Sequence, residues 1–384
     1  MSLDWLGPEL AGIDAKNLRR RLRLVAGAQG PVIRLDGRDV VNFSSNDYLG
    51  LAGDRRLIAA AGLAAEKFGA GAGSSRLIAG NLEIFERLEA ALARHKGCPA
   101  ALLFNSGYHA NLGVITSLVG PDDTIFSDRR NHASIIDGCR LSRARVQVFE
   151  HNDVEHLDRL LAVDRSRRRL AVTESLFSMD GDLAPLPAIA AVARERGAML
   201  VIDDAHAGGL LGPRGEGGLR HFGLAPDAAD AVVGTLGKAY GSAGAFVAGS
   251  APLRDLLVNR ARSFIFTTGP APAAAGAALE ALRVAADETW RRERALALAD
   301  RLRAGLGALG LCLTASVAAI VPVVLGSESA ALAASDRLLA RGFFVSAIRP
   351  PTVPPGTSRL RITVTAGHTE EQVDGLVAAI REAL

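Results

Sequence analysis

Short apolar runs alternate with longer amphipathic stretches through the middle of the chain. In residues 81–96, Phe85, Leu88 and Leu92 recur at helical spacing, with Asn81 as the expected N-cap and Gly97 as the expected end. A second helical pattern follows Ser106 and reaches residue 119. Strands alternating with longer helices predict βαβ units, so we expect an α/β fold with a largely parallel sheet covered on both faces. The predicted strands are residues 101–105, 124–128, 146–149, 170–174, 199–203 and 231–235.

The pattern changes near residue 270. A Thr-Thr-Gly-Pro turn at 267–270 precedes a helical region that is rich in Ala, Arg and Leu and reaches about residue 309. The pattern beyond it predicts a smaller α+β domain. Its expected segments are strand 320–325, helix 330–341, strand 343–347, a proline-rich loop at 349–356, strand 360–365 and a final helix. We therefore expect a large domain of residues 46–275 and a small domain of residues 276–384. Residues 1–45 are expected to be a segment that packs with the small domain.

Charge and cysteine content exclude several classes of protein. The 384 residues carry 44 Lys and Arg against 41 Asp and Glu, and a net charge of +3 does not predict a nucleic-acid or membrane-binding surface. Cys98, Cys139 and Cys312 form no C-x-x-C pair, so we expect neither a disulfide framework nor a metal site. Residues 1–24 lack the apolar core of a signal peptide, and no apolar run reaches roughly 18 residues. We therefore expect a cytoplasmic protein.

An acid and a histidine follow one of the predicted strands. The strand at 199–203 ends in Asp203, and His206 comes three residues later. One interpretation is that Asp203 caps a following helix. The other is that it holds a cation, because a buried carboxylate requires a partner. Ligands bind at the carboxyl ends of strands in open α/β sheets. The protonated ring nitrogen of pyridoxal phosphate (PLP) would be such a partner.

A lysine follows the next strand along the chain. Lys238 stands between Gly237 and Gly241 in the turn after the strand at 231–235. Most lysines lie on solvated faces, but a partly buried lysine has a lowered pKa and its amine can attack an aldehyde. Together with Asp203 and His206, it predicts a PLP enzyme whose cofactor forms a Schiff base with Lys238.

Other strand-end residues could complete such a site. Gly107 and Tyr108 begin a helix, where backbone N–H groups can bind a phosphate. Hydroxyl groups of Thr235, Thr267 and Thr268 could add to this cradle.

Two further positions are ambiguous when taken singly. His132 lies in a loop after a strand, where a histidine is more often a surface residue. Near PLP, however, it could stack on the ring and transfer a proton. Ser178 is typical of a turn unless the cofactor lies nearby.

Four motifs, in order along nearly the whole chain, resemble the α-oxoamine synthases. These are fold-type I PLP-dependent transferases that condense an amino acid with an acyl thioester. The motifs are Asn-Phe-Ser-Ser-Asn-Asp-Tyr-Leu-Gly at 42–50, Ser-Met-Asp-Gly-Asp at 178–182, Asp-Asp-Ala-His at 203–206 and Gly-Lys at 237–238. The resemblance implies a large domain with a mostly parallel seven-stranded sheet, a smaller C-terminal α+β domain, and a homodimer with shared active sites.

The C-terminal region narrows the resemblance. The segment Ala-Ile-Arg-Pro-Pro-Thr-Val-Pro at 347–354 resembles the corresponding segment of the family members that act in biotin biosynthesis. Family members of the glycine C-acetyltransferase type usually lack this segment. The resemblance to the members of biotin biosynthesis implies a decarboxylating acyltransferase that acts on L-alanine and a pimeloyl thioester. Whether the acyl carrier is coenzyme A or an acyl carrier protein stays open.

The resemblance also assigns roles to individual residues. It implies catalytic roles for Lys238, His132, Asp203 and His206. The implied PLP contacts add Gly107, Tyr108, Ser178, Thr235 and, from the other subunit, Thr267 or Thr268. The implied substrate contacts are Arg19, Asn46, His132, Arg349 and Thr352, although three successive arginines at 19–21 leave that register open.

Two alternatives use the same fold. An aminotransferase would also use Asp203 and Lys238, but would release pyruvate from alanine without a thioester. A non-catalytic subunit of the family would usually lack the lysine, which is present here.

Overall fold

The computed structural model describes residues 3–311 and 313–384, so Cys312 lies outside the described residues. Contacts divide the chain into two compact units. Unit 1 comprises residues 1–50, 179–182 and 293–384, and unit 2 comprises residues 51–178 and 183–292. The domain boundaries expected from the sequence stay predictions.

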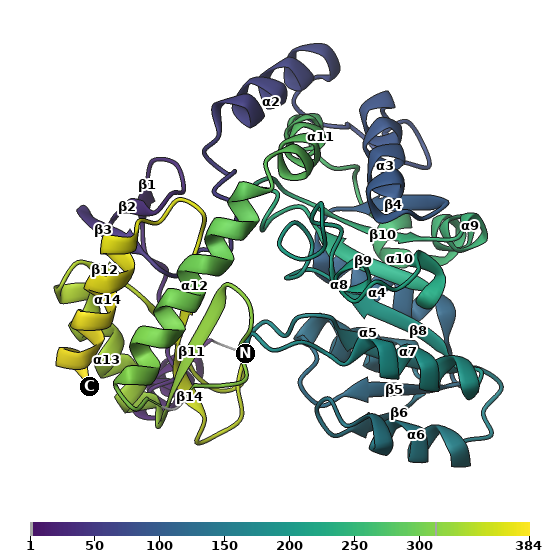
Figure 1. Ribbon diagram of the computed structural model, residues 1–384. Helices are drawn as coiled ribbons and strands as arrows, with labels where there is room; N and C mark the ends of the chain where they lie inside the picture. Colours follow the sequence, from purple (N-terminus) through teal and green to yellow (C-terminus); the bar gives the residue numbers. More distant parts are fainter. Residues whose placement is uncertain (1–2, 312) are drawn as a thin grey trace. The chain divides into compact units, whose positions relative to one another are not determined.

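Unit 2 contains a seven-stranded sheet in the order β4-β10-β9-β8-β7-β5-β6 (Figure 1). Strands β6, β5, β7, β8 and β9 run parallel to one another, and β10 is antiparallel to both β4 and β9. The expected mostly parallel sheet is therefore confirmed, but the prediction missed β10, a short Ala-Phe-Val-Ala-Gly run. The strands are β4 (Ala100–Phe104), β5 (Thr124–Asp128), β6 (Arg145–Phe149), β7 (Arg169–Glu174), β8 (Met199–Asp203), β9 (Ala231–Thr235) and β10 (Ala245–Gly249).

Alternate side chains of these strands enter two separate cores. In β8, Val201 packs with the helices α4, α5, α9 and α10, whereas Leu200 and Ile202 pack with α6, α7 and α8. Both faces of the sheet are therefore covered, as a parallel sheet requires. The helices of unit 2 are α2 (Arg55–Phe68), α3 (Glu83–Lys96), α4 (Gly107–Leu118), α5 (Ala133–Ser142), α6 (Val154–Val163), α7 (Leu186–Glu195), α8 (Gly218–His221), α9 (Ala251–Arg260), α10 (Arg262–Ile265) and α11 (Pro272–Asp287).

Helix α3 corrects one detail of the sequence prediction. Its N-cap is Leu82, without a side-chain cap, because the oxygen of Asn81 accepts hydrogen bonds from Arg76 and its amide donates to Glu86. The predicted end at Gly97 is confirmed: this residue has a left-handed backbone with φ of 70°, which favours glycine.

Unit 1 holds two smaller sheets, with the orders β1-β2-β3-β12 and β11-β14-β13. The single strand expected at 343–347 is wrong: β12 and β13 belong to different sheets. The helical region expected to reach residue 309 consists of two helices, because one helix ends at Asp287 and the next begins at Trp290. The elements are α1 (Leu6–Ala15), β1 (Val25–Ala26), β2 (Val32–Leu35), β3 (Arg38–Asn42), α12 (Trp290–Ala308), β11 (Ile320–Gly326), α13 (Glu328–Ala340), β12 (Phe343–Phe344), β13 (Ser346–Ile348), β14 (Ser358–Thr363) and α14 (Glu370–Ala383).

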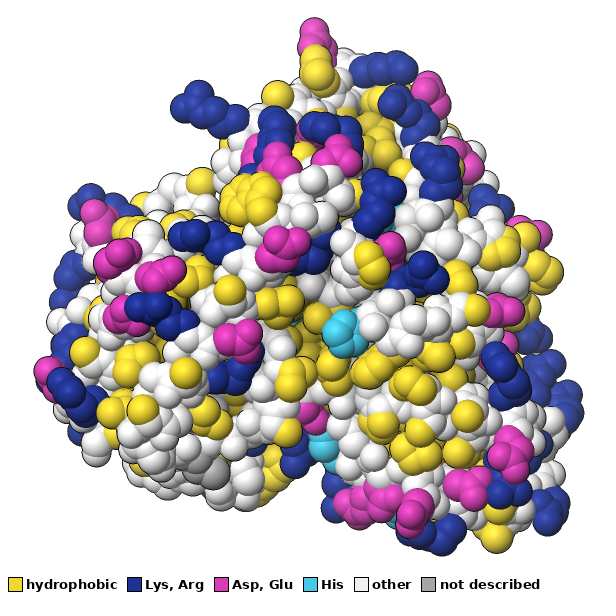
Figure 2. Space-filling model, viewed as in Figure 1, with side chains coloured by type: hydrophobic (Ala, Val, Ile, Leu, Met, Phe, Trp, Pro, Cys, Tyr) yellow, Lys and Arg dark blue, Asp and Glu magenta, His cyan; other side chains and the backbone are white. Residues whose placement is uncertain are grey.

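Charged side chains of both signs are interspersed on the face shown in Figure 2. Within residues 3–311 and 313–384, no helix combines the length and the apolar character needed to cross a membrane.

Candidate active site

Asp203 is buried at the carboxyl end of β8, between β7 and β9. Its Oδ1 accepts a hydrogen bond of 2.9 Å from the backbone N–H of Ala205, and its Oδ2 accepts one of 2.7 Å from Asn111 Nδ2. A turn follows β8, and the next helix begins only at Gly218. The helix-cap interpretation of Asp203 is therefore wrong.

Lys238 lies in the turn that follows β9. Gly241, with φ of +60°, closes this turn by donating its N–H to the carbonyl of Lys238 at 2.8 Å. A Cβ at Gly241 would lie 2.4 Å from the backbone nitrogen of Ala52, so this position requires glycine. Lys238 Nζ lies 2.7 Å from Nε2 of the buried His206.

His132 is the N-cap of α5, with its Nδ1 accepting a hydrogen bond of 3.2 Å from the backbone N–H of Ser134. Part of the residue remains exposed to solvent. The protein atoms packed around the ring lower the pKa of His132, whereas the charge of Asp203 raises it and that of Lys238 lowers it. The structure thus brings His132, Asp203, Lys238 and His206 into one cluster.

Glu174 belongs to the same cluster, although the sequence interpretation assigned it no role. It ends β7 directly opposite Asp203 and is buried. Burial, together with the charge of Asp203, raises the pKa of Glu174 to about 8. Its Oε2 accepts a hydrogen bond of 3.3 Å from the N–H of Ser178. An acid at the end of a predicted strand was the signal that could have identified it.

The predicted phosphate cradle lies at the start of α4. Gly107 is the first residue of this helix, and Ser106 caps it by accepting a hydrogen bond from the N–H of His109. Asn105 donates from Nδ2 to Thr267 Oγ1 at 3.1 Å and to the carbonyl of Thr268 at 3.0 Å. The two threonines therefore lie beside the helix start within one chain, and Asn105 is a contact that the sequence did not predict.

Two other residues of the predicted cradle already have hydrogen-bond partners. The hydroxyl of Tyr108 donates to Asp137 Oδ2 at 2.5 Å. The hydroxyl of Thr235 donates to the carbonyl of Gly244 at 3.2 Å.

Apart from His132, the predicted substrate residues belong to unit 1. Arg349 and Arg19 both line a cavity of about 660 Å³. The guanidinium of Arg349 donates to the backbone carbonyl of Asn17 and, at 3.5 Å, to that of Arg19. Desolvation and the charge of Arg20 lower the pKa of Arg349.

The other two predicted substrate residues of unit 1, Asn46 and Thr352, are not among the residues that line this cavity. Asn46 Oδ1 accepts a hydrogen bond of 3.1 Å from Arg361. Thr352 is exposed, and its N–H donates to the carbonyl of Arg349 at 3.1 Å.

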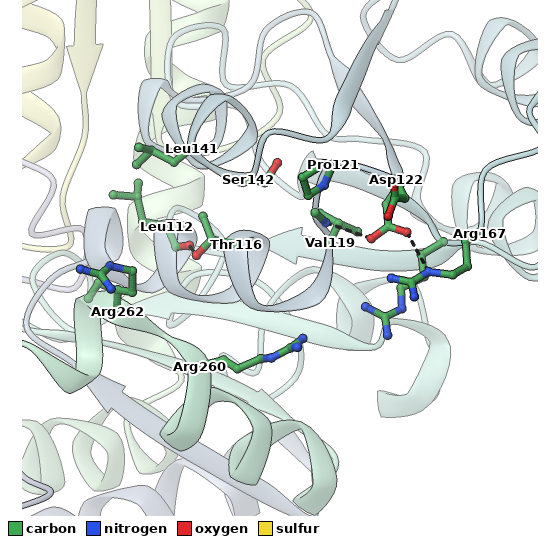
Figure 3. A pocket seen from close by; sticks show the side chains of 14 residues that line it. Leu112, Thr116, Val119, Pro121, Asp122, Leu141, Ser142, Arg167, Arg260 and Arg262 are labelled. Carbon is green, nitrogen blue, oxygen red and sulfur yellow. Dashed lines mark hydrogen bonds and ion pairs between the residues drawn. The ribbon is translucent and has the colours of Figure 1, made fainter.

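Unit 2 also has a cavity of about 570 Å³ that contains none of the predicted site residues (Figure 3). Asp122 and Asp123 line it just before β5, and Arg167 and Arg168 line it just before β7. It therefore lies at the amino ends of these strands, whereas Asp203 and Glu174 lie at their carboxyl ends. Ligands of open α/β sheets bind at the carboxyl ends, so we do not assign this cavity to the active site.

The strand-end cluster, which consists of His132, Glu174, Asp203, His206 and Lys238, has the groups needed to bind PLP. Asp203 is a buried carboxylate that can hold a protonated ring nitrogen, and Lys238 provides an amine next to His206. The N–H groups at the start of α4 provide an anion site. Among the described residues, Oε1 of the buried Glu174 has no hydrogen-bond partner, which leaves a polar atom of the site for a ligand or a proton to satisfy.

Comparisons with known proteins identify the family. The model of aminotransferase classes I and II matches residues 38–380. The 8-amino-7-oxononanoate synthase of Anaeromyxobacter dehalogenans (strain 2CP-1 / ATCC BAA-258) is 55% identical over 383 residues, which cover 100% of this chain and 96% of the relative.

Two solved structures extend this similarity to the fold. A serine palmitoyltransferase from S. paucimobilis with a bound PLP–myriocin aldimine has a TM-score of 0.93 and 33% identity, covering 100% of this chain and 98% of the other. An 8-amino-7-oxononanoate synthase from Francisella tularensis has a TM-score of 0.78 and 27% identity, covering 89% of this chain and 97% of the other. The chain belongs to the 8-amino-7-oxononanoate synthase family of fold-type I, PLP-dependent acyltransferases.

Proposed function

We propose that this enzyme condenses L-alanine with a pimeloyl thioester, giving 8-amino-7-oxononanoate, CO2 and the free thiol carrier, in biotin biosynthesis. The observation that carries the proposal is the strand-end cluster, in which Lys238 Nζ lies 2.7 Å from His206 Nε2. The relatives that match the full length of the chain supply the choice of substrates.

PLP, when bound, supplies a protonated ring that withdraws electrons from the α-carbon of the amino acid. Asp203 would keep the proton on the ring nitrogen, because its buried carboxylate stabilises the cation. The Lys238 amine would bind the cofactor before the reaction and then remove the α-proton of alanine.

The histidines and the serine of the cluster would orient the cofactor and move protons. His132 would stack on the ring and donate a proton to the oxyanion that forms at the thioester carbonyl. His206 and Ser178 would approach the phenolic oxygen of PLP. Gly107, Tyr108 and Thr235 would hold its phosphate.

Substrate binding and assembly complete the proposal. Arg349 and Asn46 would bind the alanine carboxylate, and Arg19 and Thr352 would contact the substrate. We further propose a homodimer in which Thr267 or Thr268 reaches the phosphate of the other subunit. The carrier of the pimeloyl group is coenzyme A or an acyl carrier protein.

A product assay tests the proposed function. Purified enzyme with PLP, L-alanine and pimeloyl-CoA should yield the nine-carbon amino-ketone and one CO2 per free thiol. Parallel reactions replace alanine with glycine or serine, and pimeloyl-CoA with acetyl-CoA. Release of pyruvate without thioester consumption would identify an aminotransferase instead. Preferential use of glycine and acetyl-CoA would identify another α-oxoamine synthase.

A further inference from the structure

A chain of hydrogen bonds joins the end of β8 to the first turn of α5. Asn111, on α4, donates from Nδ2 to Asp203 Oδ2 at 2.7 Å and to Ser134 Oγ at 2.9 Å. Ser134 Oγ in turn lies 2.8 Å from His132 Nδ1. Two side chains without an assigned role thus connect the carboxylate and the imidazole of the cluster.

The direction of each bond follows from the groups involved. The amide nitrogen of Asn111 has two hydrogens to donate, and the carboxylate of Asp203 can only accept. Because the Ser134 hydroxyl accepts from Asn111, its own hydrogen is available for His132 Nδ1. The backbone N–H of Ser134 also donates to this nitrogen, at 3.2 Å. An imidazole nitrogen that accepts carries no proton, so a neutral His132 has its proton on Nε2.

The burial of Asn111 and Ser134 indicates that these polar side chains do more than fill space in the core. Asn111 and Ser134 are each only 1% exposed. Among the residues that the structure describes, Oδ1 of Asn111 has no hydrogen-bond partner, an unfavourable state for a buried amide oxygen. An apolar side chain would fill this position without that penalty. The neutral imidazole is favoured independently, because the surrounding protein lowers the pKa of His132.

We propose that Asn111 and Ser134 are positioning residues that act through His132: they fix the orientation of its imidazole, keep its proton on Nε2 and tie the ring to Asp203. The use of the Nε2 proton in catalysis rests on the proposed function. The tautomer and the hydrogen-bond chain belong to the PLP-free protein as well.

The test combines substitutions along the hydrogen-bond chain with a measurement that does not depend on activity. Ser134→Ala removes the hydroxyl, Ser134→Thr retains it, and Asn111→Leu removes the amide. Ser117→Ala is the matched control, because Ser117 is also 1% exposed and donates from Oγ to the carbonyl of Gly113 at 2.6 Å, away from His132. Nitrogen-15 NMR of labelled histidines in PLP-free protein reports which ring nitrogen carries the proton, and the signal lost in His132→Gln identifies His132.

The wild type, Ser134→Thr and Ser117→Ala should show an unprotonated Nδ1 and a protonated Nε2. Ser134→Ala should shift the nitrogen signals towards a mixture of tautomers. Its kcat should fall roughly tenfold to a hundredfold, with a smaller change in KM for alanine, because a reacting group is misplaced. Adding Asn111→Leu to Ser134→Ala should lower kcat by much less than Asn111→Leu does alone, since both act through one chain.

Three results would overturn the proposal. They are a protonated Nδ1 in the wild type, identical behaviour of Ser134→Ala and Ser117→Ala, and multiplicative effects of Asn111→Leu and Ser134→Ala on kcat. If Asn111→Leu fails to fold, the NMR signals and kcat of Ser134→Ala and Ser134→Thr are sufficient to test the proposal. If the wild type forms no amino-ketone, the proposed function fails, while the NMR experiment still decides the tautomer.

Discussion

The strand-end cluster of unit 2 and the arginine-lined cavity of unit 1 hold their polar groups in different ways. Asp203 and Glu174 end paired strands and accept hydrogen bonds from backbone N–H groups. Arg349 and Arg19 lie on segments outside the helices and strands. The guanidinium of Arg349 donates to backbone carbonyls, and Arg20 donates to the carbonyl of Pro350 at 3.3 Å.

This difference separates two kinds of site. Charges at strand ends are fixed by the ladder of the sheet before a ligand arrives, so little reorganisation is needed on binding. Arginines on irregular segments can move, and the repulsion between Arg20 and Arg349 would be relieved by an anion. We therefore expect substitutions in unit 2 to affect cofactor and turnover, and substitutions in unit 1 to affect mainly substrate affinity.

The largest effect is expected for Lys238→Ala. The variant lacks the amine proposed to bind PLP and remove the α-proton, so turnover should fall on the order of 10³-fold or more. The visible absorption of the bound cofactor should also be lost. Lys67→Ala, at an exposed lysine of α2, is the control and should retain both. A Lys238→Ala protein that keeps the wild-type absorption band would remove Lys238 from the site.

The next largest effect concerns a buried ion pair next to the strand-end cluster. Lys96 and Asp204 form a buried ion pair of 2.6 Å, and Asp204 also accepts from Ser175 at 2.6 Å and from the N–H of Gly218 at 2.9 Å. Lys96→Met would leave a buried carboxylate without its cation, so the free energy of unfolding should drop by about 3–5 kcal/mol.

Denaturant titration of Lys96→Met measures that free energy. Lys67→Met breaks the exposed Lys67–Glu83 pair and should change it by less than about 1 kcal/mol. If the two substitutions lowered the free energy of unfolding equally, the buried Lys96–Asp204 pair would contribute no more to stability than the exposed pair.

The same difference explains what the sequence could predict. The strands β5, β8 and β9 have the predicted bounds, because each is a short run whose residues are almost all buried on both faces of the sheet. Asp203, His206 and Lys238 could be found because the end of a buried strand is a fixed place in such a sheet. Glu174 satisfies the same rule, because it ends β7 beside Asp203.

Other features depend on contacts that no local pattern contains. Asn111 lies on the inner face of α4 like any core position, and only the packing of α4 against β8 and α5 gives it Asp203 and Ser134 as partners. The division of residues 343–348 between two sheets depends on pairing with β3 and β14, which are distant in sequence.

In unit 1, Arg349→Met should raise KM for L-alanine by roughly 10- to 100-fold, as expected for the loss of a charged hydrogen bond. The change in kcat should be smaller, and the visible absorption of bound PLP should stay. Arg341→Met, at an exposed arginine that pairs with Glu382, is the control. A loss of PLP absorption with unchanged KM would contradict the division of roles between the two units.

The smallest effect concerns the pH dependence of the strand-end cluster. Glu174 has a folded-state pKa of about 8 against a usual value near 4.5. Between these values the folded protein retains a proton that the unfolded chain has released, so stability falls as the pH rises through this window. Glu174→Gln resembles the protonated form, and it should match the PLP-free wild type near pH 5 but melt about 2–5 °C higher above pH 8. Asp203 and Lys238 face the same carboxyl group and are unchanged in the variant, so the difference between the two melting curves isolates Glu174. A melting temperature of Glu174→Gln that is higher by the same amount from pH 5 to 9 would mean that Glu174 is ionised throughout this range, and that the strand ends of unit 2 carry a second fixed negative charge beside Asp203.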